Sequence, residues 1–277
     1  MSPSMTEIHD RRAAFRRLHD AGCFAIPNPW DVGSARWLAA AGFKALASTS
    51  SGSAWSQGLP DGRMSLPQAL ESLRALVGAT ELPVNADFES GYAADAEGVA
   101  RNVRAAIATG IAGLSIEDAT GQAETPLFAL PEAVQRLRAA RAAIDASGQA
   151  VLLIGRAENF IVGRPDLDDT IARLRAYAQA GADCLYAPGL STREQIAAVV
   201  AAVAPKPVNV LVGRADMGLT MADLAALGVR RVSVGGALAR AAWGGFMRAL
   251  QPLVQEGRFD GLADAASGQA LNRFFGG

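Results

Sequence analysis

Residues 97–118 read EGVARNVRAAIATGIAGLSIED and contain the repeating unit that decides the fold. The first part has the apolar spacing of a helix, and Gly110 suits the left-handed conformation that often ends one. A short apolar run follows at 113–118 and finishes on two acidic residues. A helix followed at once by a strand with polar residues at its end predicts one unit of a parallel β/α fold.

The same unit recurs along the chain. Helical segments rich in Ala, Leu and Arg separate eight apolar runs, at 23–27, 45–49, 82–88, 113–118, 151–158, 184–189, 207–213 and 231–236. Eight strand–helix units in 277 residues predict a closed α/β fold, the (β/α)8 barrel. An open doubly wound sheet would more often carry a glycine-rich phosphate motif after its first strand, where this chain reads NPWDVGSA.

Nothing divides the chain, so we expect a single domain over 1–277 that ends in a helical tail at about 237–277. With 26 basic and 27 acidic residues the net charge is −1, which argues against nucleic acid or a membrane as partner. The amino terminus lacks the apolar core of a signal peptide, and no apolar run is long enough to span a membrane. We therefore expect a cytoplasmic protein.

The stretch PVNADFESGY, residues 83–92, places oxygen-bearing side chains at the end of the third strand. Asn85 and Asp87 share one strand face because they are two residues apart, and Glu89 joins them if the strand extends that far. Active sites of such barrels form at the carboxyl ends of the strands. Glu117 ends the fourth strand and Arg156 lies near the end of the fifth, so we expect both at this opening.

The donor types predict which cation and which ligand the opening would bind. Both histidines, His9 and His19, precede residue 20, so a histidine-based zinc site or triad is not expected. Oxygen ligands alone favour Mg²⁺ or Mn²⁺. An arginine facing the same space would pair with a substrate carboxylate, and a small 2-oxo acid is the simplest molecule that satisfies both groups.

Residues 48–62, STSSGSAWSQGLPDG, follow the second strand. Their small side chains would let backbone N–H groups approach an anion, although the same composition is typical of a flexible serine-rich loop.

Several spaced motifs together resemble the isocitrate lyase and phosphoenolpyruvate mutase superfamily: STSSGSAWSQGLPD, VNADFESGY, SIEDA, IGRAENF and PVNVLVG. They stand in the expected order and span about residues 24–236. The resemblance implies a (β/α)8 barrel that binds Mg²⁺ and makes or breaks a C–C or P–C bond beside a 2-oxo acid, through an enolate. It also implies a homo-oligomer, a dimer or a tetramer, whose C-terminal helices exchange between subunits.

The resemblance assigns roles residue by residue. Asp87 is similar to the direct metal ligand, and Asn85 stands where the family usually has a further aspartate. Asp61 and Glu117 resemble the acids that hold metal-bound waters. The expected substrate contacts are Trp30, Ser48, Thr49, Ser50, Arg156 and Asn209. The expected catalytic residues are Glu117 and Arg156, together with Glu89 and Tyr92, which come into the opening because VNADFESGY is two residues longer than the family's usual form. Glu89, Tyr92 or a metal-bound water would move the proton.

One departure bears on mechanism. Lyases and mutases of this family carry a Lys-(Lys/Arg)-Cys-Gly-His loop after strand four, where this chain reads EDATGQAETPLFALPE. A lyase needs a proton donor for the enolate, and the family's usual donor is missing. The sequence therefore predicts a divergent member: a Mg²⁺-dependent lyase or decarboxylase, with P–C bond hydrolysis or rearrangement and non-catalytic 2-oxo acid binding as the alternatives.

Overall fold

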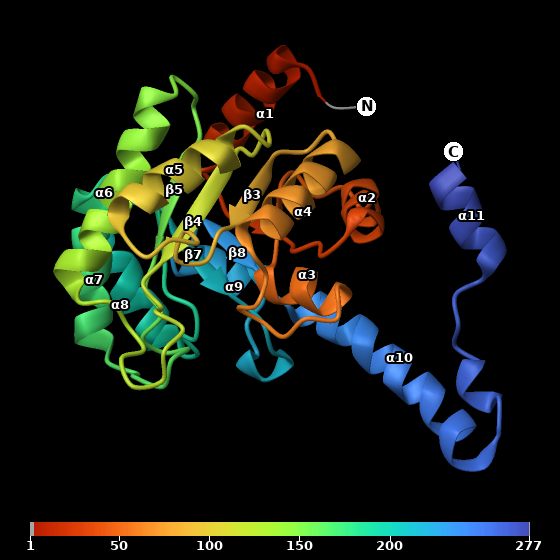
Figure 1. Cartoon of the computed structure of the whole chain (residues 1–277). Coiled ribbons are helices and arrows are strands. Elements are labelled where there is room, and N and C mark those ends of the chain that lie inside the picture. Colours follow the sequence, from red (N-terminus) through yellow and green to blue (C-terminus); the bar gives the residue numbers. More distant parts are fainter. Residues whose placement is uncertain (1–2, 277) are drawn as a thin grey trace. The chain divides into compact units, whose positions relative to one another are not determined.

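The computed structural model describes residues 3–276, and up to Ala237 they form an eight-stranded barrel surrounded by helices (Figure 1). All eight predicted strands are confirmed. Each ends one to three residues before the end of the predicted run, because the last residues of the run belong to the loop that follows. The strands are β1 (Phe24–Ile26), β2 (Leu46–Ala47), β3 (Val84–Asp87), β4 (Gly113–Glu117), β5 (Leu152–Arg156), β6 (Cys184–Tyr186), β7 (Val208–Leu211) and β8 (Arg231–Ser233).

The strands pair in parallel in the order β1-β8-β7-β6-β5-β4-β3-β2. Between β1 and β2 the barrel is joined by a hydrogen bond in which Ala47 N–H donates to the carbonyl oxygen of Pro27 at 3.0 Å. The register places Glu117 of β4 beside Arg156 of β5, and Arg156 beside Tyr186 of β6. The predicted (β/α)8 fold is confirmed.

Helices alternate with the strands, and glycines end several of them. Gly110 and Gly181 have φ of +92° and +100°, and a Cβ on Gly181 would lie 2.7 Å from Cγ of Arg141. The helices are α1 (Met5–Leu18), α2 (Val32–Ala40), α3 (Ser50–Ser56), α4 (Leu66–Ala79), α5 (Ala96–Ile107), α6 (Leu130–Ala146), α7 (Leu167–Gln179), α8 (Arg193–Val203), α9 (Met221–Ala226), α10 (Ala237–Glu256) and α11 (Gly268–Gly276), with 3₁₀ turns η1 (Ala215–Met217) and η2 (Asp260–Leu262).

Alternate strand residues supply two separate cores. Outward-facing side chains such as Leu114 and Ile116 pack against the helices in the larger core. Inward-facing side chains, including Ile26 and Ile154, form a smaller core inside the barrel. The period of two along each strand produces this division.

Helix α1 closes the amino-terminal end of the barrel. Phe15 is fully buried and belongs to the inner core. The Arg12 guanidinium donates to the carbonyl oxygens of Ile107 at 3.0 Å and Ile111 at 2.9 Å, just before β4. Since this end is filled, the carboxyl ends of the strands form the open end.

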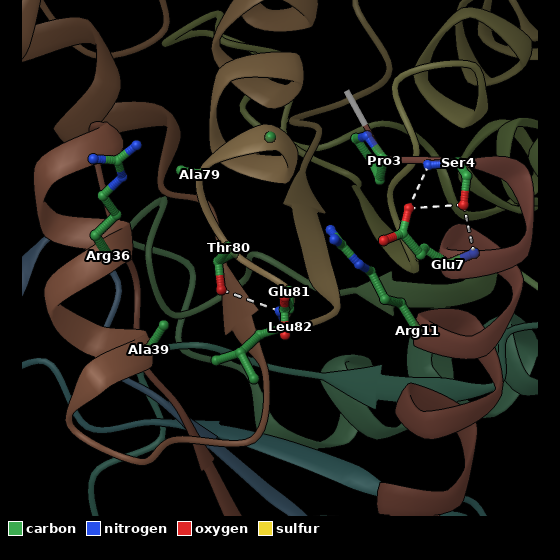
Figure 2. Close-up of a pocket in the computed structure, with 11 residues that line it drawn as sticks. Pro3, Ser4, Glu7, Arg11, Arg36, Ala39, Ala79, Thr80, Glu81 and Leu82 are labelled. Carbon is green, nitrogen blue, oxygen red and sulfur yellow. Dashed lines mark hydrogen bonds between the residues drawn. The ribbon is translucent and has the colours of Figure 1, made fainter. Parts of the chain in front are cut away.

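A pocket of about 690 Å³ lies near the closed end, between α1, α2 and the segment that leads into β3 (Figure 2). Arg11 and Arg36 line it together with Glu7, whose carboxylate accepts from the backbone and side chain of Ser4. The pocket lies away from the strand carboxyl ends and contains none of the expected site residues.

A second compact unit begins at Leu238 and contains α10, apart from its first residue, and α11. Its boundary coincides with the start of the tail expected at about 237–277. Among residues 3–276, no helix combines the length and the apolar character needed to cross a membrane.

Phe15→Ala is expected to lower the free energy of unfolding by about 3 to 5 kcal/mol, because it leaves a cavity at the base of the inner core. Urea unfolding followed by tryptophan fluorescence measures this change. Met5→Ala, an exposed position on the same helix, is the matched control and should change stability by less than about 0.5 kcal/mol. Similar small losses of unfolding free energy in both variants would contradict the role of α1 in closing the amino-terminal end of the barrel.

Candidate active site

The centre of the open end is the guanidinium of Arg156, the last residue of β5. Its Nη1 lies 3.0 Å from Oδ1 of Asp87 and 3.0 Å from Oε2 of Glu117, and its Nε contacts Glu158. The carboxylates come from the ends of β3 and β4 and from the loop after β5. We call these four residues the arginine cluster. Three neighbouring strand ends therefore meet at one cation.

Burial and charge act against each other in the arginine cluster. Burial raises the pKa of Glu117 well above its ordinary value, and Arg156 offsets only part of that shift. Burial likewise raises the pKa of Glu158. Burial alone would lower the pKa of Arg156, but Glu117, Glu158 and Asp87 raise it well above its ordinary value. Arg156 is therefore a permanent cation surrounded by more acids than it can neutralise.

Residues after β2 fix Asp87 in place. Its Oδ2 accepts from the backbone N–H of Ser50 at 3.0 Å and from the Ser50 hydroxyl at 2.9 Å, and its own N–H donates to Ser48 Oγ at 2.8 Å. Thr49 caps α3, which begins at Ser50. The flexible-loop interpretation of the serine-rich stretch is therefore wrong for 50–56, which is helical.

The loop after β3 holds Glu89 and Tyr92 together. Tyr92 Oη donates to Glu89 Oε1 at 2.9 Å, and both residues have positive φ, 45° and 53°. Arg136 of α6, itself buried, donates to the carbonyl oxygens of Ser90 and Ala93 at 2.7 Å and so secures the loop. Burial, with smaller effects from Asp87 and other acids, raises the pKa of Glu89 to about 7.

The other expected metal-site residues lie differently. Burial raises the pKa of Asp61, and the charge of nearby Asp87 raises it further. Asn85 lies two residues deeper along β3, where its Nδ2 donates to the carbonyl oxygen of Ala86 at 3.1 Å and its Oδ1 accepts from Arg231 at 3.4 Å. Asn85 therefore lies in a deeper layer of the barrel, and its hydrogen bonds to Ala86 and Arg231 do not reach the arginine cluster.

Two of the expected substrate contacts lie outside the arginine cluster as well. Asn209 of β7 is fully buried and shares the deeper layer with Asn85, because both bond to Arg231. Trp30, after β1, lines a separate pocket of about 350 Å³ together with residues of α3 and α4. Ser48 and Thr49 are buried beside Asp87.

The donor chemistry of this end of the barrel fits a hard divalent cation. Arg156 Nη1 contacts both Asp87 and Glu117. In this arrangement, no three Asp, Glu, His or Cys side chains among residues 3–276 are grouped closely enough to hold a metal ion. Burial raises the pKa of Asp61, Glu89, Glu117 and Glu158, and the positive charge near these acids is too small to offset it. Oxygen-bound Mg²⁺ or Mn²⁺ would supply that charge.

The connection after β4, residues 118–129, folds back on itself. Ala119 pairs with Leu127 in an antiparallel bridge, and Phe128 N–H donates to the carbonyl oxygen of Asp118 at 2.9 Å. The residues between 119 and 128 include no Lys, Arg, His or Cys. The one ionisable side chain of residues 119–128, Glu124, is exposed.

Sequence reasoning left several residues of this end without a role. Glu158 contacts Arg156, and its backbone N–H donates to Oδ1 of Asp118 at 2.8 Å. Asp118 Oδ2 accepts in turn from Arg173 at 3.0 Å and from the Tyr177 hydroxyl. The alternation of strand faces could have identified Tyr186 as inward-facing, and the single charged residue in RVSVGG could have drawn attention to Arg231.

Comparison with known proteins agrees with this geometry. The family model of phosphoenolpyruvate phosphomutase matches residues 15–254. A solved structure from Burkholderia cenocepacia J2315, provisionally described as a lyase/mutase, is 49% identical with a TM-score of 0.94 and covers 98% of each chain. Oxaloacetate decarboxylase from Rhodopseudomonas palustris (strain BisB5) is 33% identical over 217 residues, 76% of this chain and 72% of the relative. The structure of oxaloacetate acetylhydrolase in complex with the product oxalate is 27% identical with a TM-score of 0.86, covering 97% of this chain and 94% of that one.

The family match includes α1 from Phe15 onward, every strand and nearly all of α10. The barrel supplies the acids of β3 and β4 and the arginine of β5 at one end, as the motif resemblance implied. The chain belongs to the phosphoenolpyruvate mutase/isocitrate lyase superfamily.

Proposed function

We propose that this protein is a divalent-metal-dependent carbon–carbon lyase that acts on a small 2-oxo acid, with decarboxylation of oxaloacetate as the first reaction to test. The observation that carries the proposal is the arginine cluster, in which buried acids from neighbouring strands exceed the positive charge of Arg156. Similarity to an oxaloacetate decarboxylase and to an oxaloacetate acetylhydrolase supports the substrate class. Family membership supports an enzyme of the lyase or mutase type.

Asp87 would hold the cation directly, while Asp61 and Glu117 would bind its water ligands. Asn85, the fourth residue expected at the metal, would contribute its carboxamide oxygen, which accepts from Arg231 in this structure. A bound Mg²⁺ or Mn²⁺ would polarise the ketone and stabilise the developing enolate.

Arg156 would pair with the substrate carboxylate. Its Nη1 and Nε make the contacts with the acids, and among residues 3–276 no hydrogen bond or ion pair uses its Nη2. One amino group therefore remains for an anion. Ser48, Thr49 and Ser50 stand at the start of α3, where Ser48 and Ser50 bond to Asp87, and would contact the carboxylate as well.

The reaction needs one proton. Loss of CO₂ from oxaloacetate breaks the C3–C4 bond, leaves its electron pair on C3 as the enolate of pyruvate, and ends when C3 takes a proton. We propose that the Glu89–Tyr92 pair delivers that proton, because Glu124, the one ionisable residue of the 119–128 loop, is exposed, whereas burial raises the pKa of Glu89 to about 7. Both residues have positive φ, which is unfavourable for side chains other than glycine, and the bonds from Arg136 to Ser90 and Ala93 hold the loop in this conformation.

P–C bond chemistry is the second candidate, because the matching family model is that of a phosphomutase. The 119–128 loop lacks the basic side chains that would stabilise a migrating phosphoryl group. Release of phosphate from phosphonopyruvate would establish this alternative, and binding of 2-oxo acids without any product would establish a non-catalytic protein.

The protein with Mg²⁺ should convert oxaloacetate to pyruvate faster than the same Mg²⁺ concentration without protein, and chelator should remove the difference. Asp87→Asn should lower the metal-dependent rate by about 100-fold or more, because it removes the expected ligand charge. Proton NMR of pyruvate formation measures both rates.

Asp168→Asn, an exposed aspartate of α7, is the matched control and should keep the full rate. Circular dichroism tests that both variants fold. An Asp87→Asn variant that is folded and fully active would refute the metal assignment.

Glu89→Gln and Tyr92→Phe should each lower kcat by about 100-fold or more while KM changes by less than about threefold, because a general acid acts after substrate has bound. Steady-state kinetics with oxaloacetate measures both constants. Gln149→Glu, which changes a charge away from the open end of the barrel, is the control variant. A fall in kcat/KM that comes entirely from KM would assign the pair to binding instead.

We also propose a homo-oligomer formed through the carboxyl-terminal unit. Trp243, Phe246 and Met247 of α10 are exposed apolar side chains, and exposed apolar patches are typical of interaction surfaces. Light scattering after gel filtration should give a multiple of the 28.7 kDa chain mass. Phe246→Asp should lower that mass and Arg258→Asp should not. A wild-type mass of 28.7 kDa would exclude the oligomer.

A further inference from the structure

The pocket near the closed end of the barrel contains charges of both signs that do not pair with one another (Figure 2). Arg11 of α1 and Arg36 of α2 supply two positive charges. Glu7 of α1 and Glu81, which precedes β3, supply two negative charges. Among the described residues, none of these four side chains takes part in an ion pair. The pocket is therefore neutral as a whole, but its charges remain available to a ligand.

The two arginines provide hydrogen-bond donors that the protein leaves unused. Nη1 of Arg11 donates to the carbonyl oxygen of Val77 at 3.0 Å, which holds this guanidinium against the last turn of α4. Arg36 is exposed, and within residues 3–276 its side chain makes no hydrogen bond. A guanidinium has five N–H donors and no acceptor, and two of those donors can bind one carboxylate together. Both arginines can therefore bind an anionic group.

Glu7 is fixed and ionised at the start of α1. Its Oε2 accepts from the Ser4 hydroxyl at 2.7 Å and from the Ser4 backbone N–H at 2.6 Å. These two hydrogen bonds lower the pKa of Glu7. Its charge therefore persists at neutral pH. Glu81 is exposed and makes no side-chain hydrogen bond among the described residues, so its carboxylate is free to turn toward a ligand.

The carboxyl end of α4 adds backbone acceptors to the same pocket. The helix ends at Ala79, and Thr80 after it is extended, with φ −147° and ψ 158°, so the chain does not fold back over the last carbonyl groups. Gly78 and Ala79 line the pocket, and within residues 3–276 their carbonyl oxygens accept no hydrogen bond. The carboxyl end of a helix also carries a partial negative charge. This side of the pocket therefore favours a cationic group.

The two kinds of group select the ligand class. A simple anion would meet Glu81 and the free carbonyl oxygens, whereas a simple cation would meet both arginines. A molecule that carries one carboxylate and one ammonium satisfies both sets of groups. Ala39 and Leu82 supply apolar surface beside them. The volume of about 690 Å³ lies within the range of about 300 to 1,000 Å³ that is typical of small-molecule sites.

We propose that this pocket binds a zwitterionic α-amino acid with an aliphatic side chain. Its carboxylate pairs with Arg11 and Arg36, and its ammonium group binds Glu81 and the carbonyl oxygens at the end of α4. Its side chain lies against Ala39 and Leu82. Because Leu82 lies two residues before β3, the bound amino acid joins α1 to the segment that enters this strand. The site contains no residue of the arginine cluster, and its ligand does not depend on the proposed reaction.

L-leucine is the probe, and two analogues each lack one of its charges. Isothermal titration of the full chain, without metal ion or 2-oxo acid, should show saturable binding of L-leucine. The analogue 4-methylpentanoate lacks the ammonium group, and 3-methylbutylamine lacks the carboxylate. Each analogue should bind at least about 10-fold more weakly, because it leaves one set of charged groups without a partner.

Two variants of the pocket test its location. Arg36→Ala and Glu81→Gln should each weaken leucine binding by about 10-fold, because each removes one charged partner. Both residues are exposed, so both variants should fold, which circular dichroism checks. Arg138→Ala, at an exposed position on α6, is the matched control and should leave leucine affinity unchanged.

Three results would overturn the proposal. The first is the absence of saturable binding by leucine, isoleucine, valine and methionine up to about 10 mM. The second is equal affinity for leucine and 4-methylpentanoate, which would show that the ammonium group is not bound. The third is leucine affinity that neither Arg36→Ala nor Glu81→Gln changes. Since the titrations contain no metal ion and no oxaloacetate, each of these results would leave the proposed function intact.

Discussion

One guanidinium, that of Arg156, contacts carboxylates contributed by three consecutive strand ends, and the arrangement of the open end depends on it. Opposite charges this close inside a protein interact strongly, but each also loses its hydration. The contacts form only if β3, β4 and β5 keep their register, because a shift of one residue would turn Asp87 or Glu117 to the outer face. The chemistry of the site and the specificity of strand pairing therefore depend on the same alignment.

A second set of polar contacts supports the cluster from outside the barrel. The backbone N–H of Glu158 donates to Asp118, which Arg173 and Tyr177 hold from α7. Glu158 thus reaches Arg156 from a loop whose first residues are tied to the helical layer. On β3 the corresponding support comes from Arg136, which bonds the loop that carries Glu89. Buried side chains of the surrounding helices in this way fix loops that otherwise have few regular hydrogen bonds.

The sequence was sufficient for the fold and for part of the site. Eight apolar runs with helices between them predicted the strands, since burial imposes their pattern directly. Asp87, Glu117 and Arg156 were predictable because each ends or nearly ends a strand. The depth of Asn85 and Asn209 was not predictable, because it depends on the stagger of the strands around the barrel. Trp30 illustrates the same limit: it follows a strand, yet it lines a pocket of its own.

The outward faces of the strands contribute to packing alone, whereas the inward faces contribute an inner core and, at their carboxyl ends, the site. Leu114 and Ile116 of β4 pack outward among the helices, whereas Glu117 lies at the open end. Side chains that secure folding and side chains that contact ligand thus alternate along one strand. Evolution can replace the side chains at the open end, and with them the bond that is broken, while the outer and inner cores keep the chain folded. A barrel of this kind is an adaptable scaffold, in which a new reaction does not require a new core.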